Sequence, residues 1–294
     1  MMLEWLGSAI NAEALEQVEL LLDEWSTVLV FAFLGVELIR YAMMRQISWR
    51  LAGDTLVNFV TQAFFIGIAY VALGGFYLAA YFTLSEFALF EIGTTWFTVI
   101  ICIVLADFAY YWEHRFSHRV NIAWATHSVH HSSNHYNISV AYRFGPLDWL
   151  WPAFFHAPLI LMGFDPLLVL FAEFIVLLYQ TPLHTEMIGK LPRWVEAVMN
   201  TPSHHRVHHA SNTEYLDRNY AGMFIIWDRM FGTFAEERAP VTYGLVKRAD
   251  SLNPLVVFFQ GLGRLARKVV TAPSFGAGLR YLIAPPEWEA SGKR

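Results

Sequence analysis

Charged residues are scarce in this sequence: they make up 15% of its 294 positions, whereas a soluble domain typically carries about 25%. Hydrophobic residues reach 56% and aromatic residues 16%. This composition excludes a disordered chain and disfavours most soluble enzymes. The net charge of −5 provides no basic excess, so we expect no nucleic-acid partner. The composition indicates a membrane-embedded protein.

Other absences narrow the function further. Cys102 is the one cysteine and lies in an apolar run, which excludes a disulfide framework. The first 25 positions hold no Lys or Arg, so no signal peptide is expected there. There is no His-Glu-x-x-His pattern of a zinc protease. There is also no His-Pro-Gly-Gly haem signature, so electrons are expected from a separate donor protein or a soluble reductant.

Long apolar runs are abundant, and about 20 apolar residues suffice for a helix to cross a bilayer. We expect apolar helices within residues 26–44, 55–85, 92–112, 149–164 and 167–185. The run at 55–85 is too long for one upright span, and Gly74-Gly75 offers a break before a re-entrant or interfacial piece. Asp165-Pro166 is expected to form a hairpin turn. The predicted fold class is an all-α integral membrane protein with four to five transmembrane helices.

The distribution of charge predicts the orientation. Arg40, Arg45 and Arg50 follow the first span, so the positive-inside rule places residues 45–54 in the cytoplasm. Counting crossings puts residues 113–145 and 185–250 on the same side, as a histidine-rich helical cap. Glu37 and Arg40 lie three residues apart and are expected to pair. The absence of a targeting sequence and the modest length favour a bacterial inner membrane.

Three regions are predicted along the chain. Residues 1–90 form an N-terminal membrane region, and residues 91–250 form a catalytic region of spans and histidine clusters. Residues 251–294 form a C-terminal helix and tail. Apolar and basic residues alternate over 252–270, which fits either a helix in the membrane interface or a core helix of the cap. Residues 285–294 are expected to be a frayed tail.

Histidines form three clusters, and each is expected to present one helical face. Their members are His114 and His118; His127, His130 and His131; and His205, His208 and His209. So many imidazoles would be costly to bury and would repel one another when protonated, but neutral imidazole is the commonest transition-metal ligand. A single zinc ion takes about four ligands, so the number of histidines predicts two metal ions.

Three other polar residues lie near these clusters in the sequence. His135 breaks the helical spacing of its cluster, which favours a surface position or one behind the ligands. His156 lies in an apolar hairpin, where an interior residue without a metal is expected. Asp107 lies two turns before His114, where it would either accept the second N–H of a ligating imidazole or mark the helix end at the interface.

Four segments resemble the fatty acid hydroxylase and sterol desaturase superfamily. They are residues 107–118 (DFAYYWEHRFSH), 124–137 (WATHSVHHSSNHYN), 200–209 (NTPSHHRVHH) and 219–234 (NYAGMFIIWDRMFGTF). The resemblance implies a membrane oxygenase whose boxes ligate two irons that activate O₂ and attack a C–H bond of a lipid. Zinc can replace iron in overexpressed preparations. The resemblance also implies His184 and His204 as ligands beside the eight histidines of the boxes.

The last two segments look most like the alkylglycerol monooxygenase branch and its bacterial members. That branch implies an ether-lipid substrate from the bilayer and tetrahydrobiopterin as reductant. A sterol or fatty acyl desaturase or hydroxylase of the same superfamily remains an alternative. A membrane metal transporter is the alternative from another class, but it would place its ligands at mid-membrane, whereas the boxes lie beyond the ends of the expected spans.

Overall fold

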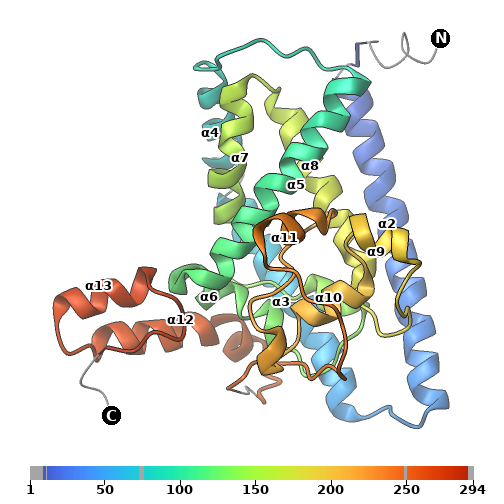
Figure 1. The fold of residues 1–294 in the computed structure, drawn as a ribbon, viewed down its shortest axis with the longest axis vertical. Coiled ribbons are helices and arrows are strands. Elements are labelled where there is room, and N and C mark those ends of the chain that lie inside the picture. Colours follow the sequence, from blue (N-terminus) through green and yellow to red (C-terminus); the bar gives the residue numbers. More distant parts are fainter. Residues whose placement is uncertain (1–8, 11, 73–75, 248–249, 291–294) are drawn as a thin grey trace.

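The structure, a computed structural model, describes residues 9–10, 12–72, 76–247 and 250–290. A bundle of upright helices carries a cap of short helices at one end (Figure 1). The bundle helices are α2 (Ala12–Met43), α3 (Trp49–Ala72), α4 (Leu78–Ser85), α5 (Trp96–Arg119), α7 (Leu150–Met162) and α8 (Pro166–Gln180). Four helices, α2, α3, α5 and α8 with its extension, are long and apolar enough to cross a membrane, and α7 is apolar but shorter. The predicted all-α membrane fold is confirmed.

The bundle has a tightly packed centre and an apolar exterior. Cys102, Ala106, Ile160 and Leu168 are completely buried where α5, α7 and α8 meet. Small side chains at such contacts let helix backbones approach closely, which is how helices associate in lipid. On the outer side of α2, large apolar side chains such as Leu29 are exposed, which suits contact with lipid rather than water.

The predicted hairpin between the two apolar segments is confirmed. Gly163 is the C-cap of α7, and its φ of 108° is left-handed and favours glycine. Asp165 is the N-cap of α8, and its carboxylate accepts the backbone N–H of Leu167 at 2.8 Å and that of Leu168 at 3.3 Å. The long run at 55–85 divides into α3 and α4. The expected break at Gly74-Gly75 lies outside the described residues.

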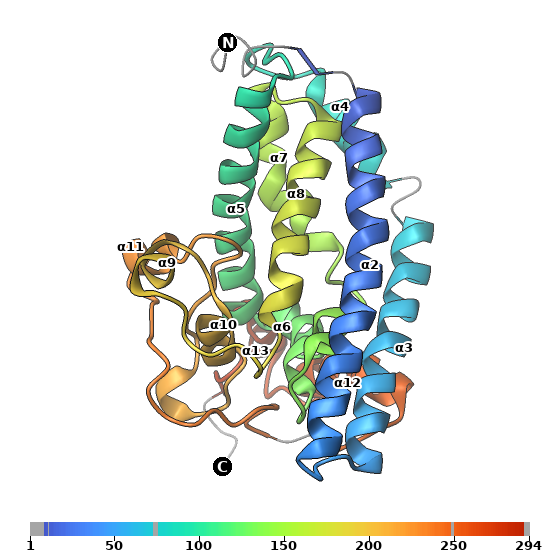
Figure 2. The ribbon, with the colours of Figure 1, turned by 90° about the vertical axis from the view of Figure 1, so that its right-hand side faces the viewer.

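The cap gathers at the end of the bundle where α2 is joined to α3 (Figure 2). Its elements are α6 (Asn121–His127), η2 (His130–Ser132), η3 (Ile138–Tyr142), η4 (Thr181–Leu183), α9 (Arg193–Val198), α10 (Pro202–His208), η5 (Thr213–Tyr215) and α11 (Ile226–Phe231). The basic connection between α2 and α3 and the histidine segments therefore share one side, as the charge pattern predicts. That this side is the cytoplasm stays a prediction.

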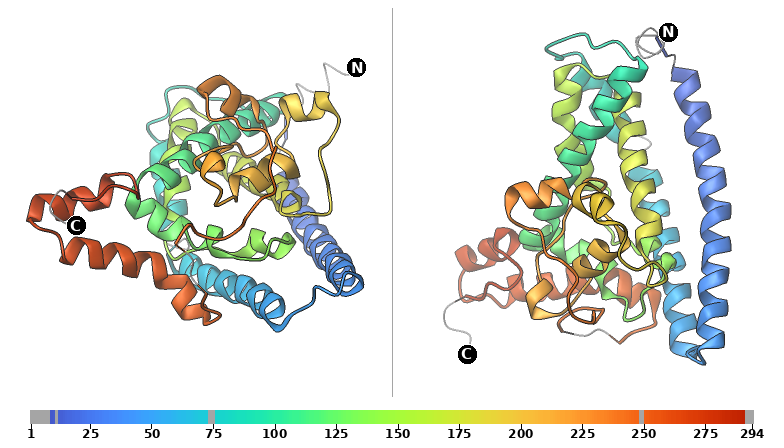
Figure 3. Two further views of the ribbon diagram at one scale, coloured as in Figure 1. Left: turned by 60° about the horizontal axis from the view of Figure 1, so that its bottom comes forward. Right: turned by 45° about the vertical axis from the view of Figure 1, so that its right-hand side comes forward.

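Two C-terminal helices project sideways from the cap (Figure 3). α12 (Pro254–Val270) and α13 (Phe275–Ile283) form this arm, and α12 contacts α6 and α3. Val257 and Phe258 are buried, while Phe259 and Phe275 expose apolar surface. One face of α12 is therefore core, and its place in a membrane interface stays a prediction.

The expectation of a frayed tail is wrong for the residues that follow α13. The Trp288 ring lies 4.8 Å from the Tyr281 ring, and the Ala290 N–H donates to the Tyr281 hydroxyl at 3.1 Å. Residues 285–290 are therefore packed against the arm, because Trp288 and the buried Tyr281 cover one another. Residues 291–294 lie outside the described part.

Candidate metal centre

The first histidine box lies on α5, which runs from the bundle into the cap without interruption. His114 and His118 are four residues apart, so they share one face of this helix. His114 Nδ1 lies 2.9 Å from the carbonyl oxygen of Tyr220, and its Nε2 lies 3.0 Å from His127 Nε2. His118 Nε2 is buried and has no hydrogen-bond partner among the described residues. Both rings therefore offer Nε2 to the interior of the cap.

The second box does not form the single helical face that its spacing predicts. α6 ends at His127, and His130 and His131 lie in the 3₁₀ turn η2. Arg143 stabilises this turn, because its Nε donates to the Val129 carbonyl at 3.0 Å. The Ser132 N–H closes a tighter turn on the same carbonyl at 3.1 Å. The chain leaves the helix here. His127 and His131 still bring their Nε2 atoms to 3.2 Å from one another, while His130 faces a different group of rings.

The third box also divides, although it lies on one helix. α10 begins with Pro202, which fits the first turn of a helix, and His209 is its C-cap. His205 and His209 are four residues apart and their Nε2 atoms approach to 3.2 Å. His208 is displaced from His209 by about 100° around the axis. The expected common face therefore holds only for His205 and His209.

The ring nitrogens of nine histidines converge into two groups, and within each group the ligand atoms all lie within 4.8 Å of one another. The first group is His114, His118, His127, His131 and His208. The second group is His130, His184, His205 and His209. The two groups adjoin, because the rings of His131 and His209 lie 4.5 Å apart. The second and third boxes each contribute to both groups.

The second group shows that these rings fit a metal ion. His130 Nδ1 lies 3.1 Å from the Arg143 carbonyl oxygen, and His184 Nδ1 lies 3.0 Å from that of Gln180. A carbonyl only accepts, so both Nδ1 atoms carry hydrogen and both neutral rings keep a lone pair on Nε2. These two Nε2 atoms face each other at 3.3 Å. A cation bound by both lone pairs removes their repulsion.

The first group has the same design. His208 Nδ1 lies 3.1 Å from the Arg218 carbonyl oxygen, so its hydrogen is directed outward. His208 Nε2 is buried and unpartnered within the described part of the chain. The rings of His208 and His114 are 4.3 Å apart. Backbone carbonyls thus fix the tautomer of ligands in both groups and direct lone pairs inward.

Burial keeps these imidazoles neutral. It lowers the pKa of six of the rings well below the usual value, and neighbouring imidazoles lower it further: His127, His130, His131, His205, His208 and His209. Burial also lowers the pKa of His184, to about 4. Neutral imidazole is the form that binds a metal.

Arg143 and Asp54 hold the second box against α3. Arg143 is buried, and its Nη1 donates to Asp54 Oδ1 at 2.7 Å and to Asn58 Oδ1 at 2.8 Å. Burial lowers the pKa of Arg143, while the Asp54 carboxylate opposes that effect. Because the Arg143 carbonyl also receives the N–H of His130, this ion pair orients one of the ligands.

The carboxylates of Glu37 and Asp107 have other partners than the sequence predicts, and they connect segments that are distant along the chain. Contrary to the expected pairing with Arg40, the Glu37 carboxylate accepts the N–H of Ile138 at 2.9 Å and the hydroxyl of Thr185 at 2.5 Å, beside His184. Asp107 fits neither of its expected roles. It is buried and accepts from the N–H of Phe224 at 3.0 Å and the indole of Trp227 at 2.8 Å.

Asp228 and Asn219 belong to no histidine box, although they shape the loop that follows the third box. Asp228 accepts the N–H groups of Tyr220 and Ala221, both at 2.8 Å. Asn219 donates to the His204 carbonyl at 3.0 Å. These bonds position the Tyr220 carbonyl that meets His114. Their signal in the sequence was their place inside the 219–234 segment that carries the resemblance.

Three histidines lie outside both groups. His204, implied as a ligand by the resemblance, turns away, and its Nε2 lies 2.9 Å from Glu196 Oε2. His135 Nδ1 lies 3.3 Å from Asp54 Oδ2. His156 is buried within the bundle. The structure thus brings together nine of the ten histidines expected to bind metal.

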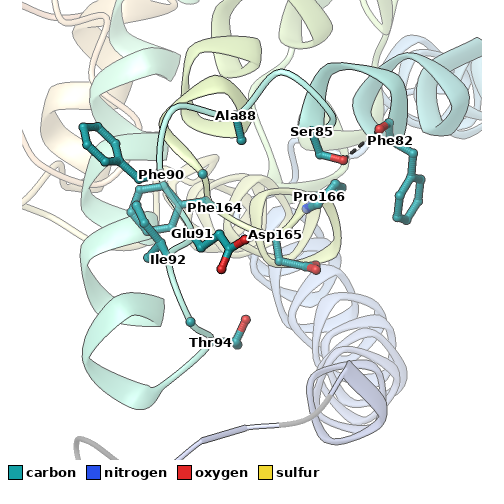
Figure 4. A pocket seen from close by; sticks show the side chains of 12 residues that line it. Phe82, Ser85, Ala88, Phe90, Glu91, Ile92, Thr94, Phe164, Asp165 and Pro166 are labelled. Carbon is teal, nitrogen blue, oxygen red and sulfur yellow. Dashed lines mark hydrogen bonds between the residues drawn. The ribbon is translucent and has the colours of Figure 1, made fainter.

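A cavity of about 420 Å³ lies at the opposite end of the bundle, between the loop before α5 and the turn from α7 to α8 (Figure 4). It is lined by Phe90, Glu91 and Asp165 among other residues. None of the grouped histidines contributes to its lining. This cavity is therefore separate from the candidate metal centre.

The sequence profile of the fatty acid hydroxylase family matches residues 99–233. The matched segment begins on α5 and includes all three histidine boxes and His184. The fold and the site define a helical membrane protein with a histidine-rich cap, and residues 99–233 match the family that the motifs resemble.

Several curated proteins are similar to the chain. It is 35% identical over 275 residues to an alkylglycerol monooxygenase of Xenopus tropicalis, covering 90% of this chain and 59% of that protein. It is 40% identical over 194 residues to the alkylglycerol monooxygenase of Homo sapiens, covering 66% of this chain and 42% of that protein. An ornithine lipid hydroxylase of Rhizobium tropici is 30% identical over 152 residues, covering 49% and 44%. The chain thus matches about half the length of these relatives. No solved structure matches it.

Proposed function

We propose that this protein is a membrane-bound di-iron oxygenase that hydroxylates a C–H bond of a lipid, with an activity like that of alkylglycerol monooxygenase. One observation carries the proposal: two adjoining groups of buried imidazoles direct lone pairs inward at the end of a membrane bundle. The names of the relatives, which are lipid hydroxylases and monooxygenases, support it.

The five histidines of the first group would hold one iron, and the four histidines of the second group would hold the other. Imidazole suits iron, and it suits zinc as well, so the donor set alone does not select the metal. When bound, two irons would activate O₂, which is the oxidant in the attack on an alkyl C–H bond. His204 is left out of the ligand set because Glu196 occupies its Nε2.

The protein's own contribution is to hold and enclose the site. Backbone carbonyls of Tyr220, Arg143 and Gln180 fix the imidazole tautomers, so the ligands need no reorganisation when metal binds. Eight of the nine rings are buried and His127 is partly buried, which keeps bulk water away from a reactive centre. Arg206 donates to the Thr185 carbonyl at 3.0 Å, which fastens α10 to the segment that carries His184.

A substrate from the bilayer fits the position of this centre. The first box continues a membrane helix, and His184 directly follows another, so a lipid chain reaches the site laterally. In the ether-lipid branch, hydroxylation next to the ether oxygen gives a hemiacetal that collapses to an aldehyde and a glycerol product. The electron donor is a separate protein or a soluble reductant, and the resemblance favours tetrahydrobiopterin. The proposed location is a bacterial inner membrane, with the histidines facing the cytoplasm.

The test is a reaction with purified, iron-loaded protein. With a 1-O-alkylglycerol, tetrahydrobiopterin and O₂, we expect a fatty aldehyde detected by mass spectrometry, and none when O₂ is omitted. No aldehyde, together with hydroxylated acyl chains or altered sterols in expressing cells, would contradict the ether-lipid activity and support the sister activity. No change in any lipid would contradict the oxygenase itself.

A further inference from the structure

A second polar cluster lies inside the bundle, outside both histidine groups. His156 of α7 stands between Glu113 of α5 and Glu173 of α8. Its Nδ1 lies 3.9 Å from Glu113 Oε2 and 3.6 Å from Glu173 Oε1. The side chain of Glu113 is 10% exposed and that of Glu173 is 12% exposed. Ionisable groups in a membrane bundle are costly and mark functional sites.

The two carboxylates differ in how they are satisfied. Glu173 accepts the hydroxyl of Tyr81 at 2.7 Å and that of Tyr77 at 3.2 Å. Glu113 Oε2 is buried and has no hydrogen-bond partner in the part of the chain that the structure describes. An acceptor left unpaired in such a place is destabilising, so Glu113 is poised for a donor from elsewhere.

His156 does not supply that donor. Its Nδ1 lies 3.1 Å from the Pro152 carbonyl oxygen, and its Nε2 lies 3.2 Å from the Ala106 carbonyl oxygen. Both ring nitrogens therefore already face main-chain acceptors. Glu113 is therefore surrounded by hydrogen-bond acceptors. A ligand that donates a hydrogen bond would fit this place best.

A small cavity reaches Glu113 from the side of the bilayer. Its volume is about 30 Å³, which is room for one group the size of a hydroxyl or a water. Its lining consists of Tyr110, Glu113, Pro152, His156, Glu173, Val176 and Leu177. Leu177 is 47% exposed on the outside of the bundle, so one wall of the cavity faces lipid. Tyr110 forms the wall toward the metal centre, and its ring lies 5.1 Å from that of His114.

We propose that Glu113 accepts a hydrogen bond from a free hydroxyl of the lipid substrate, which enters past Leu177. The inference rests on the proposed function and specifies its substrate class: a long-chain lipid alcohol whose hydroxyl lies near the carbon that is attacked. One aromatic ring separates this subsite from the first histidine group, so a bound hydroxyl positions the adjoining chain. A water molecule is the other source of an O–H donor of this size.

Binding to metal-free protein tests the subsite without relying on turnover. Radiolabelled 1-O-alkylglycerol and its di-O-methyl analogue are bound to wild type, Glu113→Met and Glu91→Met in nanodiscs. Wild type is expected to bind the diol about tenfold more tightly than the methylated lipid, the effect of one hydrogen bond to a buried group that otherwise lacks a partner. Glu113→Met removes that preference by weakening diol binding alone, because methionine offers no oxygen acceptor. Glu91→Met, the same change at the far end of the bundle, retains it.

Each failure is informative. Equal affinity of wild type for both lipids means that the cavity holds water, and it overturns the proposal without any variant. Unchanged binding of the methylated lipid shows that Glu113→Met is folded, so persistence of its diol preference overturns the role of Glu113. In turnover, this variant is expected to lower kcat/KM for the alkylglycerol about tenfold. A hydroxyl preference in a protein that oxidises no lipid contradicts the proposed function and leaves the binding site standing.

Discussion

Replacing His205 by alanine is expected to abolish turnover and to lower the metal content from two ions per chain to about one. His205 Nε2 lies 3.0 Å from His184 Nε2 and 3.2 Å from His209 Nε2, so the change removes a ligand at the centre of the second group. The remaining three histidines leave that ion weakly held. Metal analysis of the purified variant, together with an oxygenation assay, checks both parts of the prediction.

The neighbouring His204 provides a matched control. His204→Ala is expected to keep both metal ions, because its ring lies outside the groups and pairs with Glu196. His156→Ala should likewise keep both ions, since that ring lies within the bundle. Loss of metal in His204→Ala with full occupancy in His205→Ala would show that the ligand assignment is wrong. His130→Ala and His208→Ala are expected to behave like His205→Ala, each in its own group.

Asp54→Ala is expected to lower the free energy of unfolding by about 3–5 kcal/mol, because it leaves the buried Arg143 guanidinium without its counter-ion. The same change frees the segment whose carbonyl orients His130, so metal affinity at the second group should also fall. Unfolding in mixed micelles with increasing dodecyl sulfate, followed by circular dichroism, measures the loss.

Asp165→Ala is the control for that variant. Asp165 caps α8 at the other end of the bundle, so its loss is expected to cost about 1 kcal/mol and leave metal binding unchanged. If the two variants were equally stable, the Asp54–Arg143 pair would not support the second box as described.

The parts of this protein that are encoded locally were predictable from the sequence. Apolar runs predict the bundle helices because a membrane helix must satisfy its own backbone and cover itself with apolar side chains. The spacing of His114 and His118 predicts their common face because α5 continues through both. The number of histidines predicts two metals, and the structure brings nine of these side chains into two groups.

The division of the boxes between the groups could not be predicted in the same way. It depends on the 3₁₀ turn that follows α6, and Arg143, 14 positions beyond Val129, stabilises that turn by donating to the Val129 carbonyl. Glu37 was assigned to Arg40 because helical spacing was the only local information. Its partners, Ile138 and Thr185, are brought to it by the fold. The same holds for Asp107, which binds a loop more than 100 positions away.

The subsite at Glu113 shows a similar limit. Glu113 lies beside a ligand, and in the sequence it reads as part of the first box. Only the approach of α7 and α8 reveals that its carboxylate faces His156 and a cavity instead of the metal groups. The signal available in the sequence is an ionisable residue next to a membrane helix. The role of Glu113 can be inferred only when its neighbours in the fold are known.

Metal stoichiometry tests the central claim most directly. Elemental analysis of folded, monodisperse protein is expected to give two first-row transition metals per chain, one for each histidine group. They should be iron in active preparations and partly zinc after overexpression. A folded sample that takes up one ion or none after anaerobic incubation with excess ferrous iron would contradict the account of a two-metal centre.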